Sequence, residues 1–292
     1  MLLQQIINGL TIGSTFALVA IGFTMVFGVL QLVNFANGAL FMLGAYLTLI
    51  FYTAVTGNIL TAILISLVLS GLAGYLLDRS ALRLLRKQNA PRLSGLITTL
   101  GMAMIIENSI MVFYGSETRP FPNYLNFGRF ELGSAIVTWT QVILFAITIV
   151  LMVMMSLIVY KTRIGKAMLS TSQNVDAARL MGVNINNVIS FTFIVSGLMA
   201  AVAGTMMGMY YQVVGATMGV QIGMKVFAAA ILGGVGSLPG AMVGGLTLGI
   251  IETLAAGYIS SGYRDAIVFS ILIIVLLFRP TGMLGQKHIE KV

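Results

Sequence analysis

Cysteine is absent from the 292 residues, and histidine and tryptophan each occur only once. Without cysteine the chain has no disulfide, no thiol nucleophile and no thiolate metal site. The single histidine, His288, lies in the C-terminal tail, which excludes a buried Ser-His pair and a histidine metal site. Ser237 does not sit in a G-x-S-x-G motif, because residue 235 is valine. These absences argue against an enzyme and against a metal or cofactor bound by this chain.

Charge is also scarce. Charged residues make up 8% of the chain, and none occurs before Asp78. Hydrophobic residues reach 58%, with a mean hydropathy of +1.01. A soluble domain carries about 25% charged residues, so the composition predicts an integral membrane protein. Apolar runs of about 20 residues predict helices, because a lipid-exposed backbone must satisfy its own hydrogen bonds. No basic segment or cleavage pattern precedes Leu10, so we expect no removable signal peptide.

The sequence therefore predicts an all-α polytopic bundle of eight or nine transmembrane segments, formed by residues 1–292 as a single domain. The expected spans cover residues 3–29, 35–56, 59–77, 93–114, 141–160, 188–211, 241–256 and 264–278, with a shorter helix at 224–232. Asparagines and glycines at 31–44 and a glycine-rich turn at 233–240 predict broken or re-entrant helices. Residues 115–138 are expected to form an external loop with a short folded cap.

The basic residues cluster in three segments, 78–92, 161–187 and 279–292, which hold twelve of the sixteen lysines and arginines. The positive-inside rule places these segments in the cytoplasm. The N-terminus is then outside, and residues 279–292 form a cytoplasmic tail. The net charge of +8 thus reflects membrane topology rather than nucleic-acid binding.

The segment 161–187 is the long polar stretch of the second half. Ile164, Met168, Thr171, Val175 and Ala178 recur at spacings of three and four, which predicts an amphipathic helix. We expect a break at 172–174, with Asn174 capping a second short helix that ends before Gly182. A pair of short helices of this kind, called the knob below, is typical of a docking site for another subunit. A helix lying on the membrane surface is the alternative.

The same segment contains the one Gly-Lys pair of the chain, Gly165-Lys166. It lacks the upstream glycine and the following serine or threonine of a phosphate-binding loop. If transport is driven by ATP, the ATPase must therefore be another polypeptide.

Three charged residues, Glu107, Lys225 and Glu252, fall inside the expected spans. A lone charge at the bilayer centre costs about 2.5 kcal/mol or more, so each requires a partner or a water-filled neighbour. One interpretation is a polar lining of a translocation path; the other is structural pairing of Lys225 with an acid. Asn34 and Asn37 are further candidates for lining a path, because neutral amides can bind solute groups. A relay of the three charges in an ion-coupled transporter is the competing hypothesis.

Three stretches resemble the permease subunits of ABC importers for branched-chain amino acids. They are NGLTIGSTFALVAIGFTMVFGVLQLVNFANGALFMLGAY near the N-terminus, TRIGKAM…DAARLMGVN in the polar segment and KVFAAAILGGVGSLPGAMVGGLTLGIIE near the C-terminus. The resemblance implies a multi-pass permease of the bacterial inner membrane that works by alternating access. It also implies a second permease, two cytoplasmic ABC ATPases that bind ATP, and a periplasmic solute-binding protein. Carried over to this chain, the ATPase-docking residues are Arg163, Gly165, Ala177, Ala178, Met181 and Gly182.

One departure bears on the solute. Members of this family commonly have His-Gly followed by an acid where this chain reads Asn37-Gly38-Ala39. Branched-chain amino acids are the expected solutes, with urea, short amides or another small carboxylate as the alternative. The resemblance leaves open whether the two permeases are identical.

Overall fold

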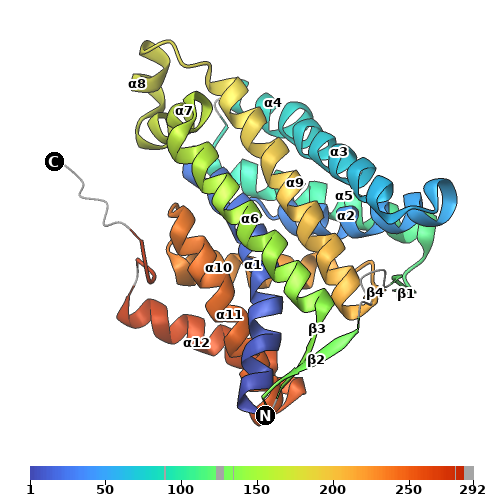
Figure 1. Ribbon diagram of the computed structural model, residues 1–292. Helices are drawn as coiled ribbons and strands as arrows, with labels where there is room; N and C mark the ends of the chain where they lie inside the picture. The colour runs from blue at the N-terminus through green and yellow to red at the C-terminus, as the bar shows by residue number, and fades with distance from the viewer. Residues whose placement is uncertain (89, 123–127, 134, 280, 286–292) are drawn as a thin grey trace.

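A computed structural model describes residues 1–88, 90–122, 128–133, 135–279 and 281–285 (Figure 1). The predicted tail is thus described only to residue 285, and His288 lies outside the described residues. The helices are α1 Leu2–Leu30, α2 Ala36–Phe51, α3 Ile59–Leu77, α4 Arg83–Lys87, α5 Arg92–Tyr114, α6 Trp139–Lys161, α7 Arg163–Gln173, α8 Val175–Leu180, α9 Ile185–Tyr211, α10 Met218–Gly233, α11 Leu238–Tyr258 and α12 Arg264–Phe278. Among the described residues, eight helices are long and apolar enough to cross a membrane. This confirms the predicted all-α polytopic fold.

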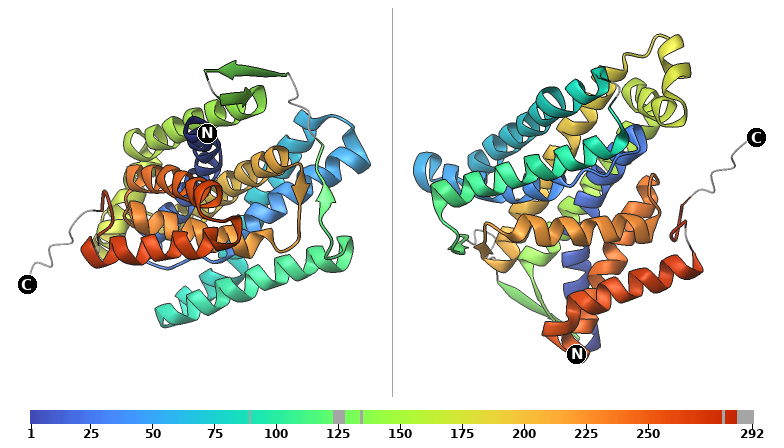
Figure 2. Two further views of the ribbon diagram at one scale, coloured as in Figure 1. Left: turned by 90° about the horizontal axis from the view of Figure 1, so that it is seen from below. Right: turned by 180° about the vertical axis from the view of Figure 1, so that it is seen from behind.

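The uncharged helix α1 forms the centre of the bundle. It packs along α11, α9 and α10, and nearly all its residues between Gly9 and Val26 are buried. Helices α5 and α12 lie at the periphery in both views of Figure 2, and few of their residues are buried. A buried α1 and outer helices with large exposed apolar surfaces are the arrangement expected when lipid, rather than water, surrounds the outer helices.

Glycines allow the helix backbones to approach closely. A Cβ atom added to Gly249 on α11 would collide with the backbone of Gly13 on α1. One added to Gly204 on α9 would collide with the carbonyl oxygen of Phe41 on α2. Glycines of α9 therefore let this helix pack closely against neighbouring helices. In lipid, close packing of this kind replaces the hydrophobic drive that joins helices in water.

The glycine-rich turn is shorter than the sequence predicts. Helix α10 begins at Met218 instead of 224, and α11 begins at Leu238 instead of 241, so only residues 234–237 lie between them. The hydroxyl of Ser237 accepts a hydrogen bond from the Gly240 N–H (3.2 Å) and caps α11. Pro239 falls in the first turn of α11, where proline has no helical hydrogen bond to lose.

Other segments predicted as loops are also structured. Residues 78–82 form a π-helical turn that joins α3 to α4. Residues 52–56, the end of the predicted span 35–56, form a second π-helical turn that extends α2. In the segment predicted to be external, 115–138, β2 (Arg129–Leu132) pairs antiparallel with β3 (Ala135–Thr138), which confirms a short folded element. A second pair joins β1 (Arg119–Pro120) to β4 (Val213–Val214).

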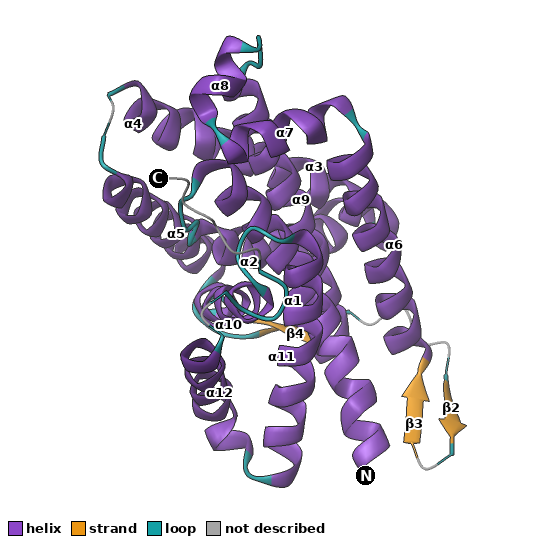
Figure 3. Cartoon of the chain, turned by 90° about the vertical axis from the view of Figure 1, so that its left-hand side faces the viewer, coloured by secondary structure: helices purple, strands orange, loops and turns teal. Residues whose placement is uncertain are grey.

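The polar segments lie at opposite ends of the bundle. Figure 3 shows α7 and α8 at one end and the β2–β3 hairpin near the N-terminus at the other. The Gln4 side chain joins the hairpin to α1 by bonding both the carbonyl oxygen (3.0 Å) and the N–H (2.8 Å) of Ile136. Helix α4 lies at the α7–α8 end (Figure 1), so the basic segments 78–92 and 161–187 share one end, as the charge distribution predicts.

The substitution Gly249→Ala tests the α1–α11 contact. The added methyl group meets the α1 backbone, which cannot move aside as a side chain can. We expect the free energy of unfolding to fall by about 2 kcal/mol, the typical cost of overpacking. Thermal unfolding of the purified protein in detergent measures this change.

Gly101→Ala is the matched control, because a Cβ atom at Gly101 in α5 has no neighbour within 4 Å. It should leave the melting temperature unchanged or raise it slightly through better helix propensity. Equal melting temperatures for the two variants would contradict the close α1–α11 packing.

Candidate translocation and docking sites

Two of the three charges inside the spans contact each other. The Lys225 Nζ on α10 lies 2.7 Å from Glu252 Oε1 on α11 and 2.8 Å from Asp265 Oδ1 at the start of α12. The side chains of Lys225 and Glu252 are each only 5% exposed. Arg264 adds longer contacts of 3.6 Å to Glu252 and 3.5 Å to Asp265. One buried ammonium group thus joins three helices, and α12 is anchored to the bundle by its first turn.

Glu107 lies apart from this ion-pair network and has a different neighbour. Its carboxylate, buried on α5, accepts a hydrogen bond from the backbone N–H of Val220 in the first turn of α10. Thr217, the residue before α10, provides no side-chain cap. The N-terminus of a helix carries partial positive charge and unpaired N–H groups. Glu107 therefore caps α10 from a neighbouring helix, while its Oε1 makes no hydrogen bond among the described residues.

The two asparagines of the N-terminal motif use their amides differently. Both polar atoms of the Asn37 amide form hydrogen bonds: Nδ2 donates to the Val19 carbonyl (3.1 Å), and Oδ1 accepts from Ser196 Oγ (2.8 Å). It thereby joins α2 to α1 and α9. Asn34 lies in the link before α2, where its Oδ1 accepts from the Ala36 N–H (3.2 Å). Its Nδ2 is buried and makes no hydrogen bond among the described residues.

The predicted two-helix knob is present as α7 and α8. Asn174 caps α8 by accepting a hydrogen bond from the Ala177 N–H (3.0 Å), and Gly182 follows with a positive φ of 84°. Met168, Thr171 and Ala178 are buried as the amphipathic pattern predicts. Ile164 and Val175 are 42% and 39% exposed, so this prediction was wrong for the two positions nearest the starts of their helices.

The six residues predicted to dock an ATPase divide into two groups. Arg163, Ala177, Met181 and Gly182 are exposed, whereas Gly165 and Ala178 are buried. A Cβ atom at Gly165 would collide with the carbonyl oxygens of Ile158 and Val159 at the end of α6. Gly165 and Ala178 therefore hold the two short helices in place, and the exposed residues form the free surface.

One residue of that surface, Leu180, is not among the six predicted from the sequence. Leu180 is 88% exposed and stands beside Met181, which is 85% exposed. Two adjacent large apolar side chains in water at the tip of a polar segment are a typical sign of an interaction surface. The dipeptide Leu180-Met181, just before the helix-ending glycine, was the signal that could have revealed it.

Similarity to known proteins identifies the family of this chain. The family described as the permease component of the branched-chain amino acid transport system matches residues 5–277. The chain belongs to this family. Membership makes it a multi-pass transport subunit rather than an enzyme, and favours the importer over the ion-coupled alternative. No solved structure was found to match this chain.

Two permeases named for branched-chain amino acid transport match this chain over nearly its whole length. The chain is 39% identical to the high-affinity branched-chain amino acid transport system permease protein BraD of Pseudomonas aeruginosa, over 99% of this chain and 98% of BraD. It is also 39% identical to the protein LivH of Escherichia coli K12, of the same description, over 99% of this chain and 97% of LivH. The autoinducer 2 import system permease protein LsrC of Yersinia enterocolitica is 30% identical over 44% of this chain and 38% of LsrC.

The ion-pair network of this permease is tested by Lys225→Met. Removing the ammonium group leaves the Glu252 carboxylate buried without its main partner. Breaking a buried pair on one side typically costs about 3–5 kcal/mol, so the melting temperature in detergent should fall sharply. The double variant Lys225→Met/Glu252→Gln should regain part of this loss, because it removes the unpaired charge.

Arg264→Gln is the matched control, since the guanidinium is 42% exposed and its contacts are long. This substitution should lower the free energy of unfolding by less than about 1 kcal/mol, as for other exposed ion pairs. If Lys225→Met and Arg264→Gln unfolded at the same temperature, the structural role of Lys225 would be refuted.

Proposed function

We propose that this chain is the permease subunit of an ATP-driven importer that moves branched-chain amino acids inward. The observation that carries the proposal is the 39% identity, across nearly the full length, to two permeases named for branched-chain amino acid transport. LsrC, named for a different import system, matches less than half of the chain. Its shorter match favours branched-chain amino acids over the solute of that other import system.

In this proposal the chain works inside a larger assembly. A second permease, identical or different, completes the membrane part, two ABC ATPases bind and hydrolyse ATP, and a periplasmic protein delivers the solute. The N-terminus is outside, the C-terminus is cytoplasmic, and the membrane is the bacterial inner membrane. The chain itself binds no cofactor and performs no covalent step.

The docking surface consists of Arg163, Ala177, Leu180, Met181 and Gly182 at the tip of α7 and α8. Leu180 and Met181 fill an apolar pocket of the ATPase, and Arg163 supplies a charge at the edge. ATP binding draws the two knobs of the assembly together. Because Gly165 packs α7 tightly on α6, movement of the knob passes to α6 as a rigid unit, and the membrane halves alternate in access.

The translocation path is assigned among Asn34, Asn37, Glu107, Lys225 and Glu252. Asn34, Glu107 and Glu252 are its polar contacts, because each retains a buried atom without a hydrogen bond in the described structure. An unpaired buried polar atom costs about 1–3 kcal/mol, which a bound solute group can recover. Asn37 and Lys225 frame the path, since their polar groups already hold helices together.

The docking surface is tested by the double variant Leu180→Ser/Met181→Ser. Truncating central apolar residues of an interface typically costs about 2 kcal/mol or more. We therefore expect the ATPase to be lost when the tagged permease is purified from its native membrane. The amount of permease inserted should not change, because both side chains are exposed.

Ile259→Ser is the control: Ile259 is 68% exposed and follows α11, at the end opposite the knob. It should retain the ATPase at the wild-type level. Full retention of the ATPase by the double variant would refute docking through this surface.

Asn34→Ala tests the path assignment. Loss of the Nδ2 donor should raise the KM for leucine uptake about tenfold, the effect of one hydrogen bond, and the melting temperature should fall only slightly. Asn37→Ala, in contrast, should lower the melting temperature markedly, because both of its hydrogen bonds link helices. An unchanged KM in Asn34→Ala would remove Asn34 from the path.

A further inference from the structure

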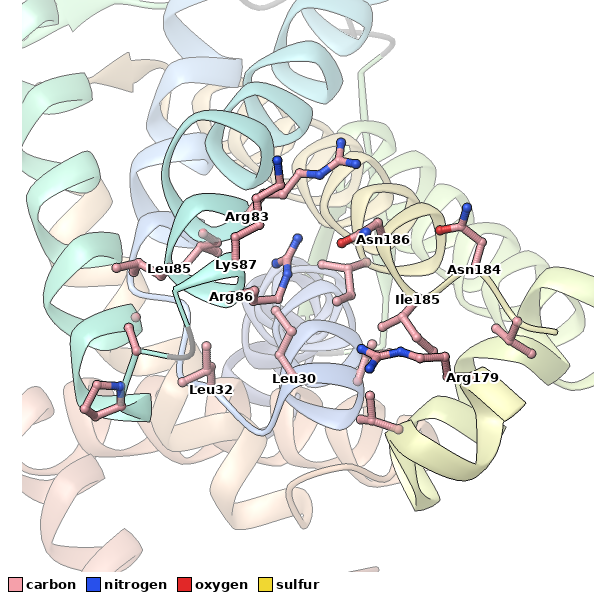
Figure 4. A pocket seen from close by; sticks show the side chains of 18 residues that line it. Leu30, Leu32, Arg83, Leu85, Arg86, Lys87, Arg179, Asn184, Ile185 and Asn186 are labelled. Carbon is pink, nitrogen blue, oxygen red and sulfur yellow. The ribbon is translucent and has the colours of Figure 1, made fainter. Parts of the chain in front are cut away.

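A basic cavity lies where several helices end, and neither the translocation path nor the docking tip accounts for it. Its volume is about 730 Å³, and it is enclosed by the ends of α1 and α4, the start of α5, α8 and the start of α9. Four basic residues line it, Arg83, Arg86, Lys87 and Arg179, and no acidic residue does. Figure 4 shows Arg86 and Arg179 on opposite sides of this cavity.

Most of this positive charge is unbalanced. Arg86 is neutralised by Asp78, which is fully buried, lies 2.7 Å away and also accepts from Ser190 Oγ (2.6 Å). Asp176 lies 4.0 Å from Arg179, but both side chains are largely exposed, so this pair is weak. Arg83 and Lys87 form no ion pair among the described residues.

The cavity also contains unused hydrogen-bond donors. The Nε atoms of Arg83 and Arg86 are buried and make no hydrogen bond among the described residues. Unpaired guanidinium donors next to unbalanced positive charge favour an anion with several acceptor oxygens, and a phosphate group meets this requirement. The spacing of Arg83, Arg86 and Lys87 places all three on one face of α4.

The location and the apolar walls of the cavity indicate which phosphate-bearing ligand fits it. The cavity lies at the ends of four membrane-spanning helices, α1, α3–α4, α5 and α9, and therefore at the depth of lipid headgroups. Leu30, Leu32 and Ile185 line it beside the basic groups. A basic rim above apolar walls matches a phospholipid, whose phosphate and acyl chains meet both surfaces.

We propose that this cavity binds the headgroup of an anionic phospholipid from the cytoplasmic leaflet. The lipid joins α4 to α8 through its phosphate, and so links the docking knob to the membrane surface. This proposal depends on the membrane placement of the chain and not on the transported solute. A transporter for any solute with this cavity would bind the same lipid.

Native mass spectrometry of the purified full-length chain in neutral detergent tests the proposal, with phosphatidylglycerol as the probe. We expect one tightly bound phosphatidylglycerol per chain and at least tenfold weaker binding of phosphatidylcholine. The double variant Arg83→Gln/Lys87→Gln removes two charge contacts at the membrane surface, so it should bind about 25-fold more weakly. Lys166→Gln, which removes an exposed charge of α7 outside the cavity, should bind as the wild type does.

Other outcomes would overturn the proposal. Wild-type lipid binding by the double variant would do so, as would displacement of phosphatidylglycerol by millimolar inorganic phosphate, which would make free phosphate the ligand. Unchanged lipid binding together with loss of the co-purifying ATPase would make the cavity a protein-docking surface. If the double variant does not fold, Arg179→Gln decides the question, because this exposed residue of α8 can be replaced without disturbing the Asp78–Arg86 pair.

Discussion

Backbone-to-backbone contact between helices is the constraint on which this structure depends. Lipid removes the hydrophobic drive between helices, so their association requires close van der Waals packing. Glycines provide this contact where α11 meets α1 at Gly249 and Gly13, and where α9 meets α2 at Gly204 and Phe41. Because the outer helices pack around α1, their ends have fixed positions. These ends in turn hold α7, α8 and the polar groups between the spans in place.

Polar residues inside the spans join helices that the glycines bring close. Asn37 connects three helices through one amide, Lys225 connects three through one ammonium group, and Glu107 caps α10 from α5. Each interaction satisfies a group that would otherwise be expensive in lipid. Asn34, in contrast, keeps an unused donor. Glu107 and Glu252 each keep one carboxylate oxygen without a hydrogen bond as well. These unused atoms, rather than whole residues, are the proposed solute contacts.

The sequence predicted the spans well, because hydropathy depends on local composition: the limits expected for residues 59–77 and 264–278 are those of α3 and α12. The start of α10 was misplaced because its cap, Glu107, comes from a helix more than a hundred residues earlier. The β1–β4 pair and the basic cavity were missed for the same reason, since both combine distant segments. Local signals did predict the capped α8 helix, through Asn174 and Gly182.

Uptake of radiolabelled leucine by proteoliposomes containing the co-purified transporter tests the central claim most directly. The claim is that this chain is a passive membrane path whose energy comes from ATPases docked on α7 and α8. It predicts that leucine accumulates when ATP is present on the side of the membrane where α7 and α8 lie, opposite the binding protein. It also predicts that an ion gradient alone drives no accumulation. Accumulation by the purified chain alone, driven by an ion gradient and without ATP, would contradict the account.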